Sequence, residues 1–330
     1  MKQLNVLINR SLEEESLRQI TAVSPEIKIW DASDLQTAEE SGDFTSSEKY
    51  NAMLSQAEVI YGFWPPKNVI ARAPKLKWIQ CMLAGVSHPS FADVFQSPVL
   101  VTNMRGMHGT QASELVFGMM LMLAKQAPLC FQMKQEKKWQ RFTPLVLNSK
   151  TVGIVGLGGI GKEVARLAKA FGMRVVANRR STRQATRAKN VDVLLPKEKL
   201  SELLSESDFV VLALPLTPET NKLIGEKELR SMKPTAFLIN IARGGIVDET
   251  ALIRALDEHW IAGAGLDTFA IEPLPPESRL WEFPNVIFSP HIAGARENYD
   301  MVITKLFCEN LRRYLSGEKL INLVDKERGY

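Results

Sequence analysis

Residues 151–172 read TVGIVGLGGIGKEVARLAKAFG, in which a β-rich run, three spaced glycines and an amphipathic helical pattern follow one another. The spacing Gly156-x-Gly158-x-x-Gly161 suits a tight turn, close approach of the backbone to a pyrophosphate, and packing of the helix on the strand. The helix N-terminus then presents free amide groups to the phosphates. We therefore predict a strand–turn–helix unit that binds a dinucleotide.

Short apolar runs alternate with helical patterns on both sides of this unit, which favours parallel sheets covered by helices. From residue 151 onward the expected strands are 151–156, 173–178, 209–214, 236–241, 262–267 and 285–290. Before it the expected strands are 3–8, 57–63, 75–82 and 97–103. We expect an α/β fold of two doubly wound parallel-sheet domains: a six-strand Rossmann dinucleotide-binding domain and a smaller flavodoxin-like substrate domain.

The expected Rossmann domain covers residues 102–295. The substrate domain is discontinuous and comprises residues 1–101 and 296–330, because the helical pattern at 300–315 crosses back to it. Ligands of open parallel sheets bind at the carboxyl ends of the strands. We expect the chemistry in the cleft between the two domains.

The bulk composition is that of a globular protein. Of 330 residues, 45% are hydrophobic and 24% are charged, and the formal net charge is +4. Five basic residues between Arg179 and Lys189 exceed that surplus, so the imbalance is local and argues against a nucleic-acid-binding face. The three cysteines lack disulfide or metal-ligand spacing and are interpreted as packed small hydrophobes. We expect no metal.

No stretch of the sequence indicates a membrane segment or a signal peptide. The most apolar run, LVFGMMLMLA at residues 115–124, is too short to span a bilayer and is typical of a buried helix. The N-terminal residues MKQLNVLINRSLEEE lack a long apolar stretch before their acidic residues. We expect a cytoplasmic protein without a membrane partner.

The end of the second Rossmann strand bears on the choice of cofactor. An NAD-binding fold usually has Asp or Glu there to accept hydrogen bonds from the ribose 2′-hydroxyl, but residues 175–181 read VVANRRS. A carboxylate would repel the 2′-phosphate of NADP(H), whereas Arg179 or Arg180 can bind it with two hydrogen bonds, with Ser181 and Arg183 nearby. We predict a preference for NADP(H), with NAD(H) possible. The alternative is a solvated basic loop.

Three polar residues follow later strands, at the edge where ligands bind. Arg243 follows the run LINIA in a glycine-rich loop, Glu272 follows the strand that ends at Asp267, and His291 follows NVIFSP. Together such groups can bind an acid, tune a base and transfer a proton. The structural alternatives are a surface cap for Arg243, a loop carboxylate for Glu272 and a buried histidine for His291.

Several motifs in order resemble the D-isomer-specific 2-hydroxyacid dehydrogenase family. They are GLGGIG (156–161), LPLTPET (214–220), NIARGGIVDE (240–249), GLDTFAIEP (265–273), PNVIFSPHIAG (284–294) and ENLRRYLSGEKLINLV (309–324). The first part of the chain matches only in general pattern. The resemblance implies hydride transfer between C4 of the nicotinamide and C2 of a 2-keto or 2-hydroxy acid.

The resemblance also implies roles for the polar residues. His291 is the general acid in reduction and the base in oxidation, and Glu272 hydrogen-bonds its other ring nitrogen and favours the charged imidazole. Arg243 holds the substrate carboxylate and polarises the carbonyl. Asp267 faces the nicotinamide and orients its carboxamide.

Sets of binding residues follow from the same resemblance. The cofactor-binding residues are Gly156, Gly158, Gly159, Ile160, Gly161, Asn178, Arg179, Arg180, Ser181, Leu214, Pro215, Thr220, Ile241, Ala242, Arg243, Asp267, His291 and Gly294. The substrate-binding residues are Arg243 and His291 with the backbone of Leu83, Ala84, Gly85 and Val86, in the stretch MLAGVSH (82–88). Leu83 stands where the family usually has glycine, which would narrow the substrate range or shift the loop.

Five further residues have two interpretations each. Trp64 is a pocket wall or a packed aromatic, and Arg105 is a second anion contact or a surface hinge residue. His88 and His108 lie in loops that could reach the cleft, and each is either a functional residue or a loop residue without a functional role. His259 is a helix cap or an exposed side chain.

The resulting expectation is an NADPH-preferring 2-ketoacid reductase, with glyoxylate or hydroxypyruvate as leading substrates. Residues 134–147 are expected to pair two subunits into a homodimer, by family analogy alone. One rival is a dinucleotide-sensing binding protein that resembles transcriptional corepressors. The other is a phosphite-type dehydrogenase; formate oxidation pairs the histidine with glutamine, and Glu272 argues against it.

Overall fold

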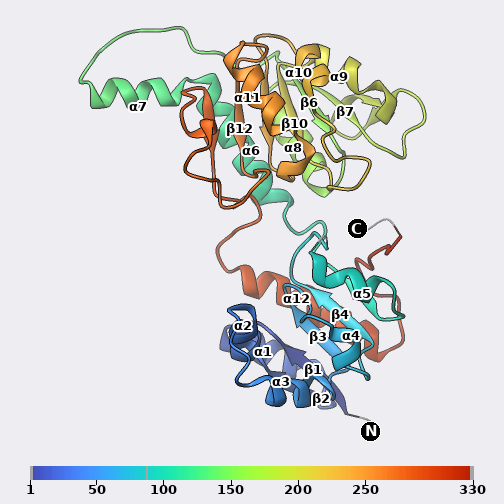
Figure 1. The fold of residues 1–330 in the computed structure, drawn as a ribbon. Helices are drawn as coiled ribbons and strands as arrows, with labels where there is room; N and C mark the ends of the chain where they lie inside the picture. Colours follow the sequence, from blue (N-terminus) through green and yellow to red (C-terminus); the bar gives the residue numbers. More distant parts are fainter. Residues whose placement is uncertain (1–2, 87, 328–330) are drawn as a thin grey trace. The chain divides into compact units, whose positions relative to one another are not determined.

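The computed structural model describes residues 3–86 and 88–327, which form two compact units (Figure 1). Unit 1 comprises Met1–Met107 and Arg296–Tyr330, and unit 2 comprises His108–Ala295. The chain leaves unit 1 after a run of parallel strands, builds unit 2, and returns to unit 1 at α12 (Tyr299–Leu315).

In the described residues of unit 1, parallel strands follow the order β2-β1-β3-β4-β5, which is the flavodoxin-like order 2-1-3-4-5. The strands are β1 (Leu4–Ile8), β2 (Ile27–Asp31), β3 (Val59–Gly62), β4 (Trp78–Cys81) and β5 (Leu100–Thr102). The helices besides α12 are α1 (Glu14–Thr21), α2 (Ser33–Glu40), α3 (Ser47–Leu54), α4 (Val69–Arg72) and α5 (Ala92–Phe95). The strand β2 corrects the sequence prediction. The sequence did not predict this strand because its five residues, IKIWD, include a lysine and an aspartate and are mostly not fully buried.

Unit 1 has an apolar layer on each face of its sheet. On one face, Val6 and Ile8 of β1 pack with Ile303 and Phe307 of α12. On the other face, Leu7 and the strand residues Ile60 and Ile79 pack with residues of the shorter helices. This alternation of neighbouring strand residues between two buried faces is the pattern of a fully covered parallel sheet.

The sheet of unit 2, over the described residues, has the order β13-β12-β11-β10-β6-β7-β9-β8. Its strands are β6 (Thr151–Val155), β7 (Arg174–Asn178), β8 (Thr186–Ala188), β9 (Val191–Leu195), β10 (Phe209–Leu212), β11 (Phe237–Asn240), β12 (Gly263–Leu266) and β13 (Val286–Phe288). The helices are α6 (Gly109–Ala124), α7 (Ala127–Gln135), α8 (Gly159–Ala170), α9 (Leu200–Glu206), α10 (Glu226–Ser231) and α11 (Glu249–Asp257). Across the sheet, the six neighbouring strands β9-β7-β6-β10-β11-β12 have the Rossmann order 3-2-1-4-5-6. The predicted fold class is therefore confirmed.

The prediction of a six-strand unit was wrong in number. The missed strands are β9, the third of the Rossmann order, and β8, which pairs antiparallel with it. The short run VDVLL of β9 comes directly after a basic, polar segment that hides the strand pattern. The run NVIFSP therefore forms an additional edge strand beside the Rossmann set.

Helices α6 and α7 differ sharply in burial. Half of α6 is buried, whereas α7 has no buried residue, and Figure 1 shows α7 projecting from the rest of unit 2. Among the described residues, no single helix is long and apolar enough to cross a membrane; α6 and α7 pass that test only as a pair bent by 60°. One prediction for the cysteines was also wrong, since Cys130 on α7 is exposed.

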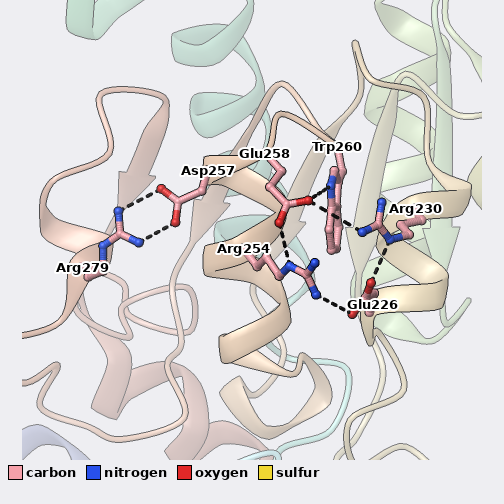
Figure 2. A network of polar contacts seen from close by, with 7 residues as sticks. All are labelled: Glu226, Arg230, Arg254, Asp257, Glu258, Trp260 and Arg279. Atoms are coloured by element: carbon pink, nitrogen blue, oxygen red, sulfur yellow. Dashed lines mark hydrogen bonds and ion pairs between the residues drawn. The ribbon is translucent and has the colours of Figure 1, made fainter.

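A network of charged residues connects α10 and α11 of unit 2 around Trp260 (Figure 2). The guanidinium of Arg230 lies 3.5 Å from the Trp260 ring and that of Arg254 lies 5.3 Å from it. Glu226 and Glu258 each contact both arginines and so join α10 to α11. These side chains are half-exposed, so each ion pair contributes little to stability. A second pair in the same view joins Asp257 to Arg279.

Candidate active site

The glycine loop joins β6 to α8 in unit 2. Gly156 has a φ of +100°, and a Cβ there would lie 2.6 Å from the Ala213 carbonyl oxygen. A Cβ on Gly161 would lie 2.2 Å from the Gly156 carbonyl oxygen, so glycine is required for α8 to pack on the loop. A Cβ on Gly158, the N-cap of α8, would meet nothing within 4 Å. The free amides of the first turn, at Gly159 and Ile160, therefore face open space in which a phosphate can bind.

Asn178, the last residue of β7, holds this loop in place. Its side-chain oxygen accepts a hydrogen bond from the Gly156 amide at 3.1 Å, and its carbonyl oxygen accepts one from the Leu157 amide at 3.2 Å. The side chain is buried. Asn178 thus positions the backbone of the loop, while its direct contact with a cofactor stays a prediction.

The predicted 2′-phosphate residues follow β7 directly. Arg179, Arg180 and Ser181 are exposed, and the Thr182 amide donates to the Arg179 carbonyl at 3.0 Å to form a turn. The segment continues with further exposed basic residues: Arg183, Arg187 and Lys189. Arg179 and Arg180 therefore directly follow the strand that also anchors the glycine loop, a position suited to binding a phosphate.

His291 and Glu272 form the central pair of the site in unit 2. Nδ1 of His291 lies 2.7 Å from Oε2 of Glu272, and Oε1 of Glu272 accepts a hydrogen bond from the Phe269 amide at 3.0 Å. Glu272 is therefore fixed by the backbone and can accept a hydrogen bond from protonated Nδ1, which leaves Nε2 for proton exchange. The His291 side chain is 44% exposed, so a ligand can reach it.

Asp267 holds the loop that carries His291. Its buried carboxylate accepts hydrogen bonds from the Ser289 hydroxyl (2.6 Å), the Ile292 amide (2.8 Å) and the Ala293 amide (2.9 Å). Its carbonyl oxygen accepts one from the His291 amide at 2.9 Å. His291 has a left-handed φ of +54°, which is unfavourable outside glycine and needs such support. The contact of Asp267 with the nicotinamide carboxamide stays a prediction.

Arg243 follows β11 and begins a short 3-10 turn. Its Nη1 donates to the Ala242 carbonyl at 2.7 Å. Burial lowers the pKa of the guanidinium, and the Glu272 carboxylate opposes that shift, so the two charges lie within electrostatic reach. A Cβ on Gly244 would lie 1.9 Å from the Phe269 carbonyl oxygen. The turn at Arg243 therefore packs directly against the segment that leads to Glu272.

The remaining predicted cofactor residues follow β10 and β11 or lie after the histidine loop. They are Leu214, Pro215, Thr220, Ile241, Ala242 and Gly294. The hydroxyl of Thr220 donates to the Pro215 carbonyl at 2.7 Å, which closes the turn after β10. Ile241 and Ala242 are buried, and the Ala242 amide donates to the Asn240 side chain at 3.1 Å, so their contact with a cofactor stays a prediction.

In unit 1 the predicted carboxylate-binding loop follows β4, and Ser87 within it lies outside the described residues. The carbonyl oxygens of residues 82–84 all accept hydrogen bonds. The donors are, in order, the Tyr299 hydroxyl (2.7 Å), the Met104 amide (3.0 Å) and Nδ2 of Asn103 (2.8 Å). By contrast, no described residue accepts a hydrogen bond from the amides of Ala84, Gly85 and Val86. Free amides in a short turn form a concavity suited to an anion.

Cys81, the last residue of β4, ties this loop to the end of β3. Its thiol donates to the Phe63 carbonyl at 2.9 Å and accepts a hydrogen bond from the Leu83 amide at 3.4 Å. Burial raises the pKa of this thiol to about 12, so it stays protonated at neutral pH and can donate. The residue was interpreted from the sequence as a packed hydrophobe, and this bonding role was missed.

Trp64 and His88 stack on each other beside the loop, with ring centroids 4.7 Å apart. The indole of Trp64 donates to Glu40 at 2.9 Å, and both rings line a cavity of about 310 Å³ in unit 1. Trp64 is thus both packed and cavity-lining. Arg105 is exposed in a turn, and His259 is exposed at the end of α11.

Asn103 and Tyr299 are further residues that sequence reasoning missed. Asn103 lies just before the segment that leaves unit 1, and Tyr299 begins α12, so neither adjoins the loop in sequence. A polar residue after a strand was the available signal for Asn103; Tyr299 gave none. Among the residues with described positions, no group of three or more potential ligands could hold a metal ion.

Comparisons with known proteins place this site in a family. The model of the D-isomer specific 2-hydroxyacid dehydrogenase, NAD binding domain, matches residues 117–293. A glyoxylate reductase of Aeropyrum pernix is 32% identical over 344 positions, covering 99% of this chain and 97% of the relative. A glyoxylate reductase of Korarchaeum cryptofilum is 38% identical over 266 positions, covering 78% and 79%.

Solved structures of the same kind are similar over the whole chain. An NADPH-dependent glyoxylate/hydroxypyruvate reductase from Sinorhizobium meliloti, in complex with NADP and sulfate, has a TM-score of 0.83 at 26% identity, covering 99% of this chain and 100% of that one. A D-isomer specific 2-hydroxyacid dehydrogenase from Xanthobacter autotrophicus, in complex with NADPH and MES, has a TM-score of 0.82 at 28% identity, covering 100% of both chains.

Proposed function

The chain belongs to the D-isomer specific 2-hydroxyacid dehydrogenase family, and from this we propose that it is an NADPH-preferring reductase of small 2-keto acids. Its class is that of oxidoreductases that act on CH–OH groups with a nicotinamide dinucleotide. The observation that carries the proposal is the His291–Glu272 pair, 2.7 Å apart, within electrostatic reach of Arg243.

We assign dinucleotide binding to unit 2, His108–Ala295, which lies within the range 102–295 expected from the sequence. The amides at the N-terminus of α8 would hold the pyrophosphate, because Gly158 leaves open space in front of them. A dinucleotide held by these amides would supply a hydride for reduction of a keto acid at C2.

His291 would deliver the proton to the carbonyl oxygen from Nε2, since Nδ1 is engaged by Glu272. In the reverse direction the same nitrogen accepts the proton of the hydroxyl. Replacing His291 with Ala should lower kcat by about 10²–10⁴-fold and leave the NADPH dissociation constant nearly unchanged. Retention of turnover in this variant would exclude His291 as the acid.

In unit 2, Arg243 would bind a substrate carboxylate; in unit 1, the loop at residues 83–86 is the proposed carboxylate-binding loop. The guanidinium is partly buried and still charged at neutral pH, and the loop supplies free amides at Ala84, Gly85 and Val86. Leu83 adds bulk to this loop. Small acids such as glyoxylate or hydroxypyruvate suit this arrangement, and glyoxylate reductase is the name of both relatives described above.

The preference for NADPH is proposed from Arg179 and Arg180, which lie exposed where a carboxylate would favour NAD. The double variant Arg179→Asp with Arg180→Ala should raise KM for NADPH by about tenfold or more, with little effect on NADH. Arg187→Ala, an exposed arginine of the same segment, is the matched control. An unchanged cofactor preference in the double variant would mean that the arginines do not contact the cofactor.

The experiment that tests the whole proposal is a steady-state assay of the purified chain. NADPH and NADH are each combined with glyoxylate, hydroxypyruvate, pyruvate and phenylpyruvate. We expect turnover with NADPH well above NADH, and kcat/KM to fall with increasing size among these four acids, each of which carries a single carboxylate. Tight NADPH binding without turnover of any acid would contradict the proposal and favour a dinucleotide-sensing protein.

We also propose a homodimer formed through α7 and the segment up to residue 147. Phe131 and Trp139 are 64% and 95% exposed, although both are large and apolar. An apolar cavity of about 650 Å³ lies between this arm and the amino ends of β11–β13, with Pro128, Leu145 and Pro234 in its lining. A second copy is the natural partner, because each copy has both an apolar arm and an apolar cavity.

Light scattering tests this dimer. The wild type should have twice the mass of one chain, and the variant Trp139→Asp should have a lower mass. A monomeric wild type would contradict the dimer.

A further inference from the structure

Arg10 is a half-buried cation at the carboxyl edge of the sheet in unit 1. It follows β1 by two residues, and its guanidinium carbon lies 3.8 Å from the centre of the Phe63 ring. Within residues 3–86 and 88–327, no carboxylate comes within 4.0 Å of this guanidinium. Its planar set of N–H donors is therefore free to bind an anion.

Arg72, also in unit 1, shows how an arginine with a purely structural role is held. Its guanidinium lies 5.1 Å from the Tyr50 ring and makes two hydrogen bonds to Glu39, at 2.8 and 2.7 Å. Its Nε donates to Asn51 at 2.7 Å. Arg10 has the same aromatic support as Arg72 but lacks the acid that completes the pairing.

The register of the sheet puts Arg10 level with the start of the carboxylate-binding loop. β3 lies between β1 and β4, with Ile8 opposite Tyr61 and Tyr61 opposite Gln80. Two residues further on, and hence on one face of the sheet, stand Arg10, Phe63 and Met82. Because adjacent strands lie about 4.8 Å apart, the backbone of Arg10 is about 10 Å from the loop, a gap that the arginine side chain largely spans.

Tyr299 provides a second link between Arg10 and the loop. Its hydroxyl donates to the Met82 carbonyl at 2.7 Å. Burial raises the pKa of Tyr299 to about 12, and the positive charge of Arg10 opposes that shift. The guanidinium thus lies within electrostatic reach of the residue that fixes the loop.

We propose that Arg10 binds a second anionic group of the substrate, distal to the carboxylate held by the amides of residues 84–86. The substrate class is then a 2-keto acid that carries a further carboxylate or phosphate on a short chain. A guanidinium binds either group with two parallel hydrogen bonds. This inference rests on the proposed function, because the loop must take the first carboxylate.

The test compares pairs of acids that differ in the second charge, with the full chain and NADPH. One pair is 2-oxoglutarate with 2-oxohexanoate, and the other is 3-phosphohydroxypyruvate with hydroxypyruvate. The wild type should show the higher kcat/KM for the dianionic acid of at least one pair. The pair that shows it identifies the second group as a carboxylate or a phosphate.

Arg10→Gln should lower that ratio by about tenfold or more, because a hydrogen-bonded charge pair is lost. Arg10→Lys should keep part of the ratio. The control is Arg18→Gln on α1, an exposed arginine whose partner is Glu15. A purely structural effect of Arg10 would change both acids of a pair equally and leave the ratio unchanged. An equal ratio in wild type and Arg10→Gln overturns the proposal.

Glyoxylate reduction by the wild type separates this proposal from the proposed function. If glyoxylate is reduced but no dianionic acid is preferred, Arg10 alone is excluded. If no acid is reduced, the proposed function fails, and calorimetry of 2-oxoglutarate binding then decides the role of Arg10. If 2-oxoglutarate binds more weakly to Arg10→Gln than to Arg18→Gln, the proposed role of Arg10 is supported. Equal binding to the two variants would exclude that role.

Discussion

The glycine loop of unit 2 and the loop at residues 82–86 of unit 1 present backbone amides in two different ways. Each follows a parallel strand at its carboxyl end. In unit 2, glycines within six residues and the adjoining helix create the free amides. In unit 1, donors from residues 103–104 and from Tyr299 take up the carbonyl oxygens of residues 82–84 and leave the amides of residues 84–86 free.

The difference predicts which substitutions should disrupt each loop. The glycine loop depends on the absence of side-chain atoms at fixed points, so a methyl group added at Gly156 or Gly161 meets a backbone oxygen within 2.6 Å. The loop of unit 1 depends on several separate hydrogen bonds, each contributing about 1 kcal/mol. We therefore expect all-or-none effects in the first loop and graded effects in the second.

The largest effect is expected from Gly161→Ala, because its Cβ would lie 2.2 Å from a backbone oxygen. We expect a loss of about 3 kcal/mol in the free energy of unfolding, together with loss of cofactor binding. The control is Gly158→Ala, whose Cβ meets nothing within 4 Å. It should keep wild-type stability and weaken NADPH binding alone. Thermal unfolding measures the stability of each variant, and NADPH titration measures its cofactor binding. Equal stability of the two variants would contradict the assignment of helix packing to Gly161 and of phosphate access to Gly158.

Asp267→Asn should come next. One carboxylate oxygen would become an NH₂ group that faces a backbone N–H, at Ala293 or at Ile292. A buried donor without an acceptor costs about 1–3 kcal/mol, and the His291 loop should lose its geometry, so kcat should fall. Asp257→Asn, in an exposed ion pair with Arg279, is the control. Chemical unfolding and kcat measure the effects, and wild-type kcat in Asp267→Asn would contradict a positioning role.

Asn103→Ala probes the loop of unit 1. It removes the hydrogen bond to the Ala84 carbonyl, so we expect a loss of about 1–2 kcal/mol in stability and a several-fold rise in KM for the keto acid. KM for NADPH should not change, because the loss is confined to unit 1. Asn51→Ala, in the same unit, serves as control. A rise in KM for NADPH with an unchanged KM for the acid would contradict the assignment of this loop to the substrate.

The smallest effect is expected from Arg254→Gln in the network of Figure 2. Its contacts with Glu226 and Glu258 are about half-exposed, so stability should change by less than about 1 kcal/mol. Both KM values should stay at the wild-type level. Steady-state kinetics and thermal unfolding of this variant give the baseline for the other variants. A large change in the KM for NADPH or for the keto acid would show that this surface network affects ligand binding at the loops.

The two loops were also unequally predictable. The glycine spacing, the basic run after β7 and the order Arg243, Glu272, His291 stand in short stretches that can be read directly. The strand count was wrong at β8 and β9, because short strands next to a basic segment give weak periodicity. The bonding roles of Cys81, Asn103 and Tyr299 were missed, because their partners lie in other segments.

By itself, the sequence determined the parallel α/β architecture, the dinucleotide loop and the identity of the polar residues that follow the strands. These features depend on local spacing, such as a glycine where a Cβ does not fit or an arginine where a strand ends. Only the tertiary structure decided which ring nitrogen of His291 is engaged, how Asp267 holds that histidine, and which amides of unit 1 are free. Such properties arise from hydrogen bonds between distant segments, and the pairing of distant segments is fixed only when the sheet and its covering helices pack.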